Sequence, residues 1–129
     1  MTDDEMVKLA AKATGYVVFQ ERDMGGALIG YKVQLQDQTC YWWDPLNDDG
    51  DALRLAVKVG IHIKIMAAAV EAYSGSSNGV YAVEILPFFD PYHPIESDAA
   101  RSRATRKAIV RRAAEHAKRN QFAATPLVG

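Results

Sequence analysis

The stretch that decides the fold covers residues 16–36 and reads Tyr16-Val17-Val18-Phe19-Gln20-Glu21-Arg22-Asp23-Met24-Gly25-Gly26-Ala27-Leu28-Ile29-Gly30-Tyr31-Lys32-Val33-Gln34-Leu35-Gln36. It opens on aromatic and β-branched residues, and from Ile29 onward apolar residues alternate with glycine, lysine and glutamine. This alternation predicts a strand that buries one face and exposes the other. Turn residues at 23–26 separate the two runs, so we predict an antiparallel hairpin.

The segments on either side of this hairpin have helical periodicity. Apolar residues recur at three- and four-residue spacing over 3–13, behind Thr2 and Asp3 as candidate caps, and Gly15 provides the stop. After a loop over 37–47, a second apolar pattern predicts a helix over 51–59.

A second hairpin is predicted from alternating residues at 61–65 and 81–85, joined through a glycine- and serine-rich turn at 74–79. Prolines then exclude regular structure as far as Pro94, because each lacks a backbone donor and restricts the residue before it. The aromatic residues expected to anchor this loop over the sheet are Phe88, Phe89 and Tyr92. A long third helix is predicted from a cap at Ser97 or Asp98 to about Asn120.

The predicted element order is α-β-β-α-β-β-α. Both tight connections join neighbouring strands, so the pairs are expected to be antiparallel. We therefore predict an α+β domain over residues 1–120 with three helices and one four-stranded, largely antiparallel sheet, followed by a tail at 121–129. How the two hairpins meet is left open by this reasoning.

Length and composition indicate a single globular domain. The chain has 129 residues, of which 49 % are apolar and 24 % are charged, and no run approaches the ~18 apolar residues that span a membrane. The acidic start, Met1 to Glu5, is unlike a basic targeting segment, and the only cysteine, Cys40, has no intramolecular partner for a disulfide. We therefore expect a reducing cytoplasm.

Charge is segregated along the chain. Residues 1–96 contain fourteen acidic and seven basic residues, whereas residues 97–129 contain two acidic and eight basic residues. The first part therefore carries a net charge of −7 and the second +6. Such segregation bears on partners more than the total of −1 does.

The acidic run at 47–51 has two interpretations. Carboxylates at short spacing can converge on a hard cation, but aligning Gly50 with the sixth position of a calcium loop places Pro45 first and Ala56 twelfth, where ligands are required. We favour helix capping by Asp48 or Asp49 at the positive end of the second helix. No metal site is predicted.

The aromatic cluster Tyr41-Trp42-Trp43 either packs in the core or forms a stacking platform for bases or sugars. Two adjacent tryptophans in an extended chain point to opposite sides. One is therefore expected to be buried and the other to lie at an edge, under a loop or at an interface.

The third helix is predicted to be broadly basic. Helical spacing places Arg103, Lys107, Arg111 and Lys118 in one stripe and Arg101, Arg112 and Arg119 in a second. Arg106 lies on the apolar side, where Asp98 or an acidic group elsewhere in the domain is expected to pair with it. The basic surface is either an electrostatic footprint for phosphates or an acidic protein, or a solvated helix face that offsets the acidic remainder.

No catalytic constellation is recognisable. His62, His93 and His116 fall on a strand, a loop and a helix without zinc-ligand spacing, and no nucleophile elbow, phosphate loop or dinucleotide fingerprint is present. Cys40 beside two tryptophans is expected to be a small buried hydrophobe rather than a nucleophile. We predict a non-enzymatic protein without a cofactor.

Two segments carry a family resemblance. They are Trp43-Asp44-Pro45-Leu46-Asn47-Asp48-Asp49-Gly50-Asp51-Ala52-Leu53-Arg54-Leu55-Ala56-Val57-Lys58 and Thr105-Arg106-Lys107-Ala108-Ile109-Val110-Arg111-Arg112-Ala113-Ala114. This pattern resembles the phage ABA sandwich domain family of small phage and prophage proteins. The resemblance implies an α-β-α layered sandwich and an origin in a bacteriophage or prophage, and therefore the cytoplasm of a bacterial host. It implies no known activity.

Our leading hypothesis is a phage or prophage accessory protein that binds a host or phage macromolecule, with no role for a membrane. The predicted binding residues are Trp42, Trp43, Arg103, Lys107, Arg111, Arg112 and Lys118. The alternative is a nucleic-acid-binding module that uses the basic helix on phosphates. A third hypothesis is a metal-dependent hydrolase using Asp44, Asp48, Asp49 or Asp51, and a homodimer through an exposed tryptophan or the proline-rich loop is a further expectation.

Overall fold

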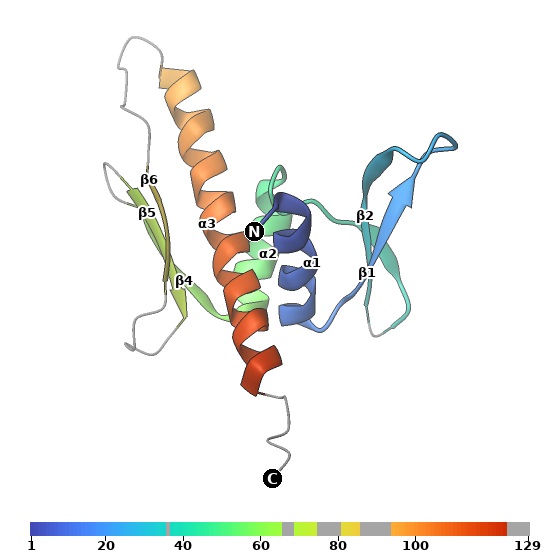
Figure 1. Ribbon diagram of the computed structural model, residues 1–129. Coiled ribbons are helices and arrows are strands. Elements are labelled where there is room, and N and C mark those ends of the chain that lie inside the picture. The colour runs from blue at the N-terminus through green and yellow to red at the C-terminus, as the bar shows by residue number, and fades with distance from the viewer. Residues whose placement is uncertain (36, 66–68, 75–80, 86–93, 124–129) are drawn as a thin grey trace.

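The computed structural model describes residues 1–35, 37–65, 69–74, 81–85 and 94–123. Within these ranges the chain is α+β, with three helices and two antiparallel three-stranded sheets (Figure 1). The elements are α1 (Asp3–Thr14), β1 (Val17–Arg22), β2 (Leu28–Gln34), β3 (Cys40–Trp42), α2 (Asp49–Val59), β4 (Ile61–Ile65), β5 (Ala69–Ser74), β6 (Tyr81–Ile85) and α3 (Pro94–Ala123).

The helices lie between the two sheets. Figure 1 shows β4–β6 on one side of α3, with α1 and α2 on its other side and β1–β3 beyond them. The single four-stranded sheet of the predicted α-β-α sandwich is therefore wrong for the described residues, because the hairpins lie on opposite sides of the helical layer. The physical reason is that α3 packs against α1 and α2 on one side and against β4–β6 on the other. The two sheets therefore cover different faces of the helical layer.

The first two helices begin and end as their sequences predict. Thr2 and Glu5 form a reciprocal capping box at the start of α1, and Asp48 accepts the backbone N–H of Asp51 at the start of α2. Each helix ends at a glycine in the left-handed conformation, Gly15 with φ 81° and Gly60 with φ 78°. Capping by Asp48 is thus confirmed.

The sheet of β1–β3 contains the predicted hairpin and one further strand. β1 pairs with β2 from Val17 opposite Gln34 to Arg22 opposite Leu28, with a bulge between Glu21 and Arg22. The short β3 pairs with the other edge of β2. Residues 40–42 were expected in a loop, and they form a strand because the edge of β2 offers them backbone partners.

The second sheet also gains a strand. The predicted strands β4 and β6 do not pair with each other, because β5 lies between them and pairs with both. The alanine-rich β5 has no strong β-propensity, but its small inward residues Val70 and Ala72 are completely buried and allow close packing against α3.

The third helix begins earlier than predicted. It starts at Pro94 and continues to Ala123. Proline suits the first helical position because a backbone N–H there would have no partner within the helix. Small buried residues of α1 and α3 meet in the core, among them Ala10, Ala11, Ala113 and Ala114. The expected anchoring residues Phe88, Phe89 and Tyr92 lie outside the described residues.

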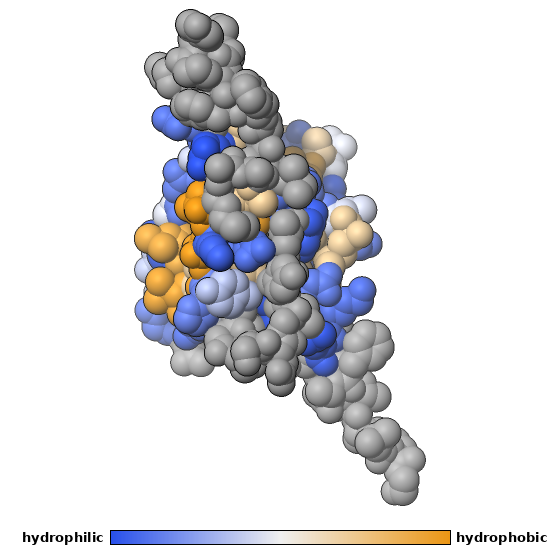
Figure 2. Space-filling model, turned by 90° about the vertical axis from the view of Figure 1, so that its left-hand side faces the viewer, coloured by the Kyte–Doolittle hydropathy of each residue, from blue (hydrophilic) through white to orange (hydrophobic). Residues whose placement is uncertain are grey.

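A view onto the β4–β6 side shows apolar side chains gathered toward the left of that face, bordered by hydrophilic ones (Figure 2). The large exposed apolar residues of α2 and β4 are Leu53, Val57 and Ile65. Scattered exposure of this kind is common on protein surfaces.

Candidate functional site

The two tryptophans separate in the manner that strand geometry predicts. Trp43 is 4 % exposed and packs edge-on against Tyr16, with ring centroids 6.4 Å apart. Trp42, in the edge strand β3, is 56 % exposed. The prediction of one buried and one exposed indole is confirmed.

The exposed indole of Trp42 lies across the outer face of the first sheet. Lys32 is its direct neighbour on β2, and the ammonium nitrogen lies 4.7 Å from the indole centroid, within the range of a cation–π contact. Gly30, two residues earlier, approaches the same ring so closely that a Cβ there would lie 3.3 Å from it. The ammonium group of Lys32 and the close approach that Gly30 allows together hold this indole in a defined position.

Next to Trp42 is a cavity of about 540 Å³ between the start of α1, the first half of β2 and the loop that leads into α2. Its large apolar lining residues are Val7, Leu28, Ile29, Trp42, Trp43 and Leu46. Its carboxylates are those of Asp3, Asp4, Asp44 and Asp51. Three segments that are distant in sequence thus converge on one aromatic and acidic cavity.

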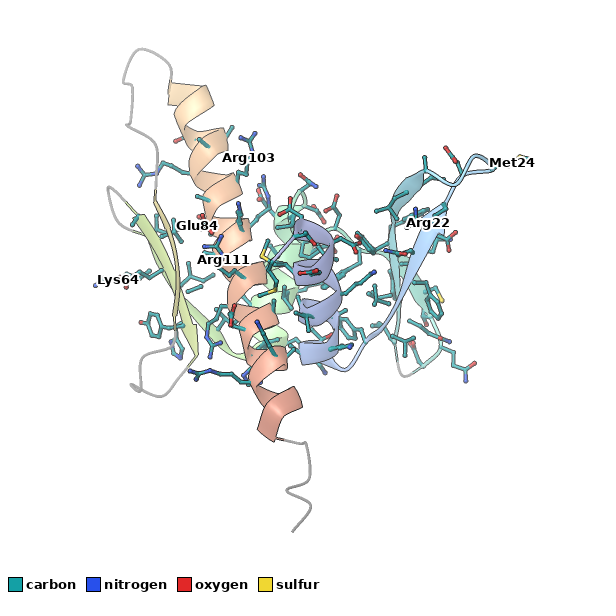
Figure 3. The ribbon with its side chains drawn as sticks, in the orientation of Figure 1. Arg22, Met24, Lys64, Glu84, Arg103 and Arg111 are labelled. Carbon is teal, nitrogen blue, oxygen red and sulfur yellow. The ribbon has the colours of Figure 1, made fainter. Side chains whose placement is uncertain are left out.

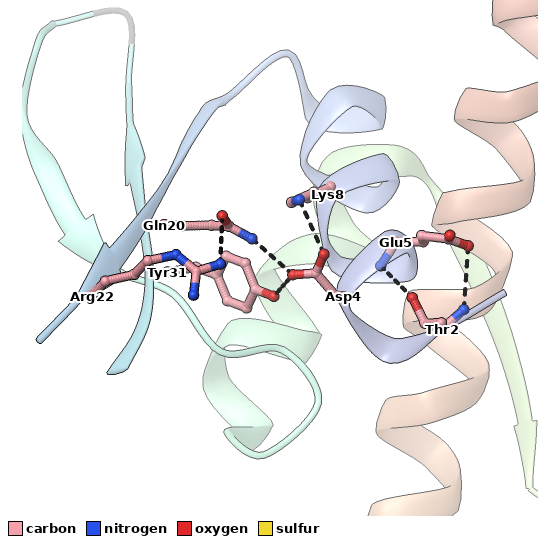
Figure 4. Close-up of polar contacts among 7 residues, drawn as sticks. All are labelled: Thr2, Asp4, Glu5, Lys8, Gln20, Arg22 and Tyr31. Carbon is pink, nitrogen blue, oxygen red and sulfur yellow. Dashed lines mark hydrogen bonds and ion pairs between the residues drawn. The ribbon is translucent and has the colours of Figure 1, made fainter. Parts of the chain in front are cut away.

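Asp4 connects α1 to the hairpin at the wall of this cavity (Figure 4). Its carboxylate accepts hydrogen bonds from the Tyr31 hydroxyl and from Gln20 Nε2 at 3.0 Å, and it forms an ion pair with Lys8 at 3.0 Å. The Tyr31 hydrogen bond is the main cause that lowers the pKa of Asp4. Burial, followed by the bond to Asp4, raises the pKa of Tyr31 to about 12.

Two other carboxylates at the cavity are also held by donors. Asp51 accepts the backbone N–H of Asp44 at 2.9 Å and a guanidinium N–H of Arg54 at 2.6 Å. Asp44 in turn accepts from the amide of Asn47 at 3.1 Å. These contacts fix the loop before α2 and orient its negative charge toward the cavity wall.

The predicted basic stripes of α3 do not form one exposed surface. Arg103 and Lys118 are exposed and Lys107 is half-buried, but Arg112 is only 4 % exposed. Arg111 forms an ion pair with Glu84 of β6 at 2.6 Å, and the two side chains point toward each other in Figure 3. The reason is that α3 packs against α1 on one side and against β5 and β6 on the other, so some of its cations face neighbouring elements.

Cys40 is exposed on edge strand β3, so the expectation of a buried small hydrophobe is wrong. Among the residues that the structure describes, strand β3 pairs along one edge only, with β2. Its Sγ approaches the backbone oxygen of Gln38 at 4.0 Å.

Sequence reasoning singled out four residues of this cavity, Trp42 and Trp43 as candidate binding residues and Asp44 and Asp51 under the hydrolase hypothesis, but it missed Asp4, Leu28 and Ile29 as site residues. Leu28, Ile29 and Asp4 carried no motif, because their proximity results from the packing of α1 and β2. The alternation over β2 places Ile29 and Tyr31 on one face, but it contains no sign of what covers that face.

Among the described residues, no group of three or more histidine, cysteine, aspartate or glutamate side chains is arranged to hold a metal ion. None of the helices in the described ranges combines the length and apolar character needed to cross a bilayer. Comparison of the chain with family models, curated proteins and solved structures finds no match.

Proposed function

We propose that this protein is a non-enzymatic binding protein that takes a segment of a partner protein at the cavity beside Trp42. The segment would insert an apolar side chain into the cavity beside the indole and would carry basic residues next to it. The observation that carries this proposal is the convergence of an exposed, positioned indole and several carboxylates on one cavity.

Three exposed large apolar side chains line this cavity. Trp42 is 56 % exposed, and its neighbours Leu28 and Ile29 on β2 are 42 % and 62 % exposed. Contiguous exposed apolar surface is typical of interaction sites. Tryptophan is enriched among the residues that dominate binding energy, because it buries a large area with few rotatable bonds.

The charges at the cavity favour a basic partner. Its charged lining residues are the carboxylates of Asp3, Asp4, Asp44 and Asp51, and Lys32, whose ammonium lies over the Trp42 ring, is not among them. Complementary charge increases the rate of association and selects against acidic partners. The polyanionic backbone of a nucleic acid is unfavourable at this surface for the same reason.

The lining also favours binding over covalent chemistry. Its described residues include no serine, threonine, cysteine, histidine or lysine that could act as a nucleophile or a basic proton acceptor near neutral pH. The hydrogen bond from Tyr31 is the main cause that lowers the pKa of Asp4, which makes the Asp4 carboxylate a weaker proton acceptor.

A nucleic-acid-binding role for α3 remains the second candidate. Among the cations of the predicted stripes, Arg103, Lys118 and Arg119 are exposed and Lys107 is half-buried. The burial of Arg112 and the pairing of Arg111 with Glu84 leave this helix with less support than the cavity.

The phage or prophage setting stays part of the proposal, and it suggests where to look for the partner. Immobilised full-length protein can be exposed to lysate from phage-infected bacteria, with and without nuclease. Three baits are compared: the original chain, the Trp42→Ala variant, and the Leu53→Ala variant as a control with an equally exposed apolar residue on α2.

We expect a protein that the original chain and the Leu53→Ala variant retain, that the Trp42→Ala variant loses, and that nuclease does not release. Raising the salt concentration should weaken its retention, because the carboxylates contribute. Equal retention by the Trp42→Ala variant would refute the cavity as the binding site. Release by nuclease would favour the α3 alternative.

A further inference from the structure

The first sheet has one long unpaired edge. In the described part of the chain the strand order is β1-β2-β3, so β1 pairs with β2 along one side only. The opposite edge of the sheet is formed by β3, which has three residues. The backbone N–H and C=O groups on the outer side of β1 can therefore bond with a further strand.

The edge of β1 lacks the devices that usually prevent strand addition. The four residues from Val17 to Gln20 contain no charge and no proline. The bulge between Glu21 and Arg22 affects only the end of the strand. Edge strands that must stay single typically carry lysine, proline or a central bulge.

Exposed apolar side chains accompany this edge. Phe19 lies opposite Lys32, which lies opposite Trp42, so Phe19 shares the outer face of the sheet with them. Val17 projects to the same side, two residues away. These two side chains are 43 % and 54 % exposed, whereas Val33 on the inner face is 2 % exposed.

We infer that β1 pairs antiparallel with β1 of a second copy of this chain, with the two Phe19 residues opposite each other on a two-fold axis. Directly opposed residues of antiparallel strands share a face, so this register places Val17 opposite Glu21 and Val18 opposite Gln20 of the second copy. No like charges oppose each other. The β1–β3 sheets of the two copies then form one continuous six-stranded sheet.

Neighbouring registers fit less well. Centring the pair on Val18 leaves only residues 17–19 paired within β1, because the chain turns into α1 at Gly15. Centring it on Gln20 places the bulge at Glu21 and Arg22 inside the paired region. The register centred on Phe19 pairs residues 17–21 and brings the exposed Val17 and Phe19 side chains of both copies together on the outer face.

A second copy is favoured over an unrelated strand because a two-fold axis satisfies both unpaired edges with the same interaction. The uncharged edge offers no charge pattern that would select a foreign partner. The cavity beside Trp42 adjoins the β3 side of β2, the opposite side from β1, so this pairing does not occupy the proposed binding site.

Sedimentation of the full chain over a range of concentrations tests the dimer. The original protein and the Leu53→Lys control should dimerise, and the Phe19→Lys variant should dimerise at least about 100-fold more weakly, because two lysines then face each other on the axis. Far-UV circular dichroism shows whether each variant is folded.

Disulfide trapping in a Cys40→Ser background tests the register independently. Oxidation should cross-link the Phe19→Cys variant to itself, because directly opposed Cα atoms lie about 4.5–5.5 Å apart. The Val17→Cys variant should not cross-link to itself, because the two sites would be about 13 Å apart along the strands. A monomer at all concentrations, or a dimer in which only Val17→Cys cross-links, would overturn the proposal.

Discussion

Arg106 of α3 reaches the start of α2, where its guanidinium lies 2.6 Å from the carboxylate of Asp49, fifty-seven positions earlier in the chain. The same side chain donates a second hydrogen bond, of 2.8 Å, to the backbone oxygen of Leu46. Arg106 is thereby mostly buried, with 14 % of its side chain exposed. One cation fastens the loop before α2 to the long third helix.

The Arg106→Ala variant should lose about 1–3 kcal/mol of unfolding free energy, mainly because the Leu46 carbonyl loses its donor. The ion pair contributes less, since the Asp49 side chain is 75 % exposed. Urea unfolding measures the difference. The exposed Arg103 provides the control, whose alanine variant should change the unfolding free energy by no more than about 0.5 kcal/mol. Equal losses in both variants would show that the contact with Leu46 is unimportant.

The Asp4–Tyr31 pair predicts two pH windows of reduced stability. The pKa of Asp4 is lowered in the folded protein, so its contribution is present above the ordinary value of about 3.9 and is lost as pH falls through the lowered value. The pKa of Tyr31 is raised from 10.0 to about 12, so its contribution is present below pH 10.0 and is lost as pH rises toward 12.

The Tyr31→Phe variant should remove the alkaline window and reduce the acid one, because it keeps the ring and deletes the hydroxyl. Unfolding free energies of both proteins, measured by denaturant titration from pH 2 to 12, test this. An alkaline decline of the same size in the variant would assign that decline to another group.

Substitution of Gly30 should disturb Trp42 before it disturbs the fold. A Cβ at Gly30 would lie 3.3 Å from an indole that is exposed and can move outward, so the Gly30→Val variant should displace the ring from Lys32. The Lys32 side-chain methylene resonances should then lose the upfield shift that the ring produces. The Gly25→Ala variant, at the hairpin turn and away from the indole, should leave these resonances unchanged. Unaltered resonances in the Gly30→Val variant would contradict the stacking.

Truncating the two tryptophans should have opposite consequences. The Trp43→Ala variant should lose about 3–5 kcal/mol, because it leaves a cavity in the core. The Trp42→Ala variant should lose only about 1 kcal/mol, mostly the contact with Lys32, and should lose partner binding instead. Thermal unfolding and the capture assay separate these effects. A large stability loss in the Trp42→Ala variant would make that residue structural.

Local features were readable from the sequence because their causes are local. The capping residues Thr2 and Asp48 and the terminating Gly15 each act within a few positions of the chain. The opposite orientations of Trp42 and Trp43 follow from the alternation of a strand. An acidic partner for Arg106 was also expected, although its identity as Asp49 was not.

Non-local features were not readable. Strand β3 is only three residues long and β5 has no strong β-propensity, and each forms because a neighbouring strand edge offers it partners. Arg111 and Arg112 were assigned to a basic surface, yet Arg112 is buried and Arg111 faces Glu84. A helical wheel shows which residues share a face, but it does not show how many faces of α3 are covered.

The sequence by itself therefore determined how the first two helices are capped and where they end, that the first hairpin is antiparallel and that one indole is exposed. These properties depend on backbone sterics, capping and the two-residue period of a strand. Only the tertiary structure decided that the helices separate two sheets, and that Asp4, Ile29 and Trp42 line one cavity. The reason is that these outcomes depend on the competition among apolar faces for burial, a property of the packed chain as a whole.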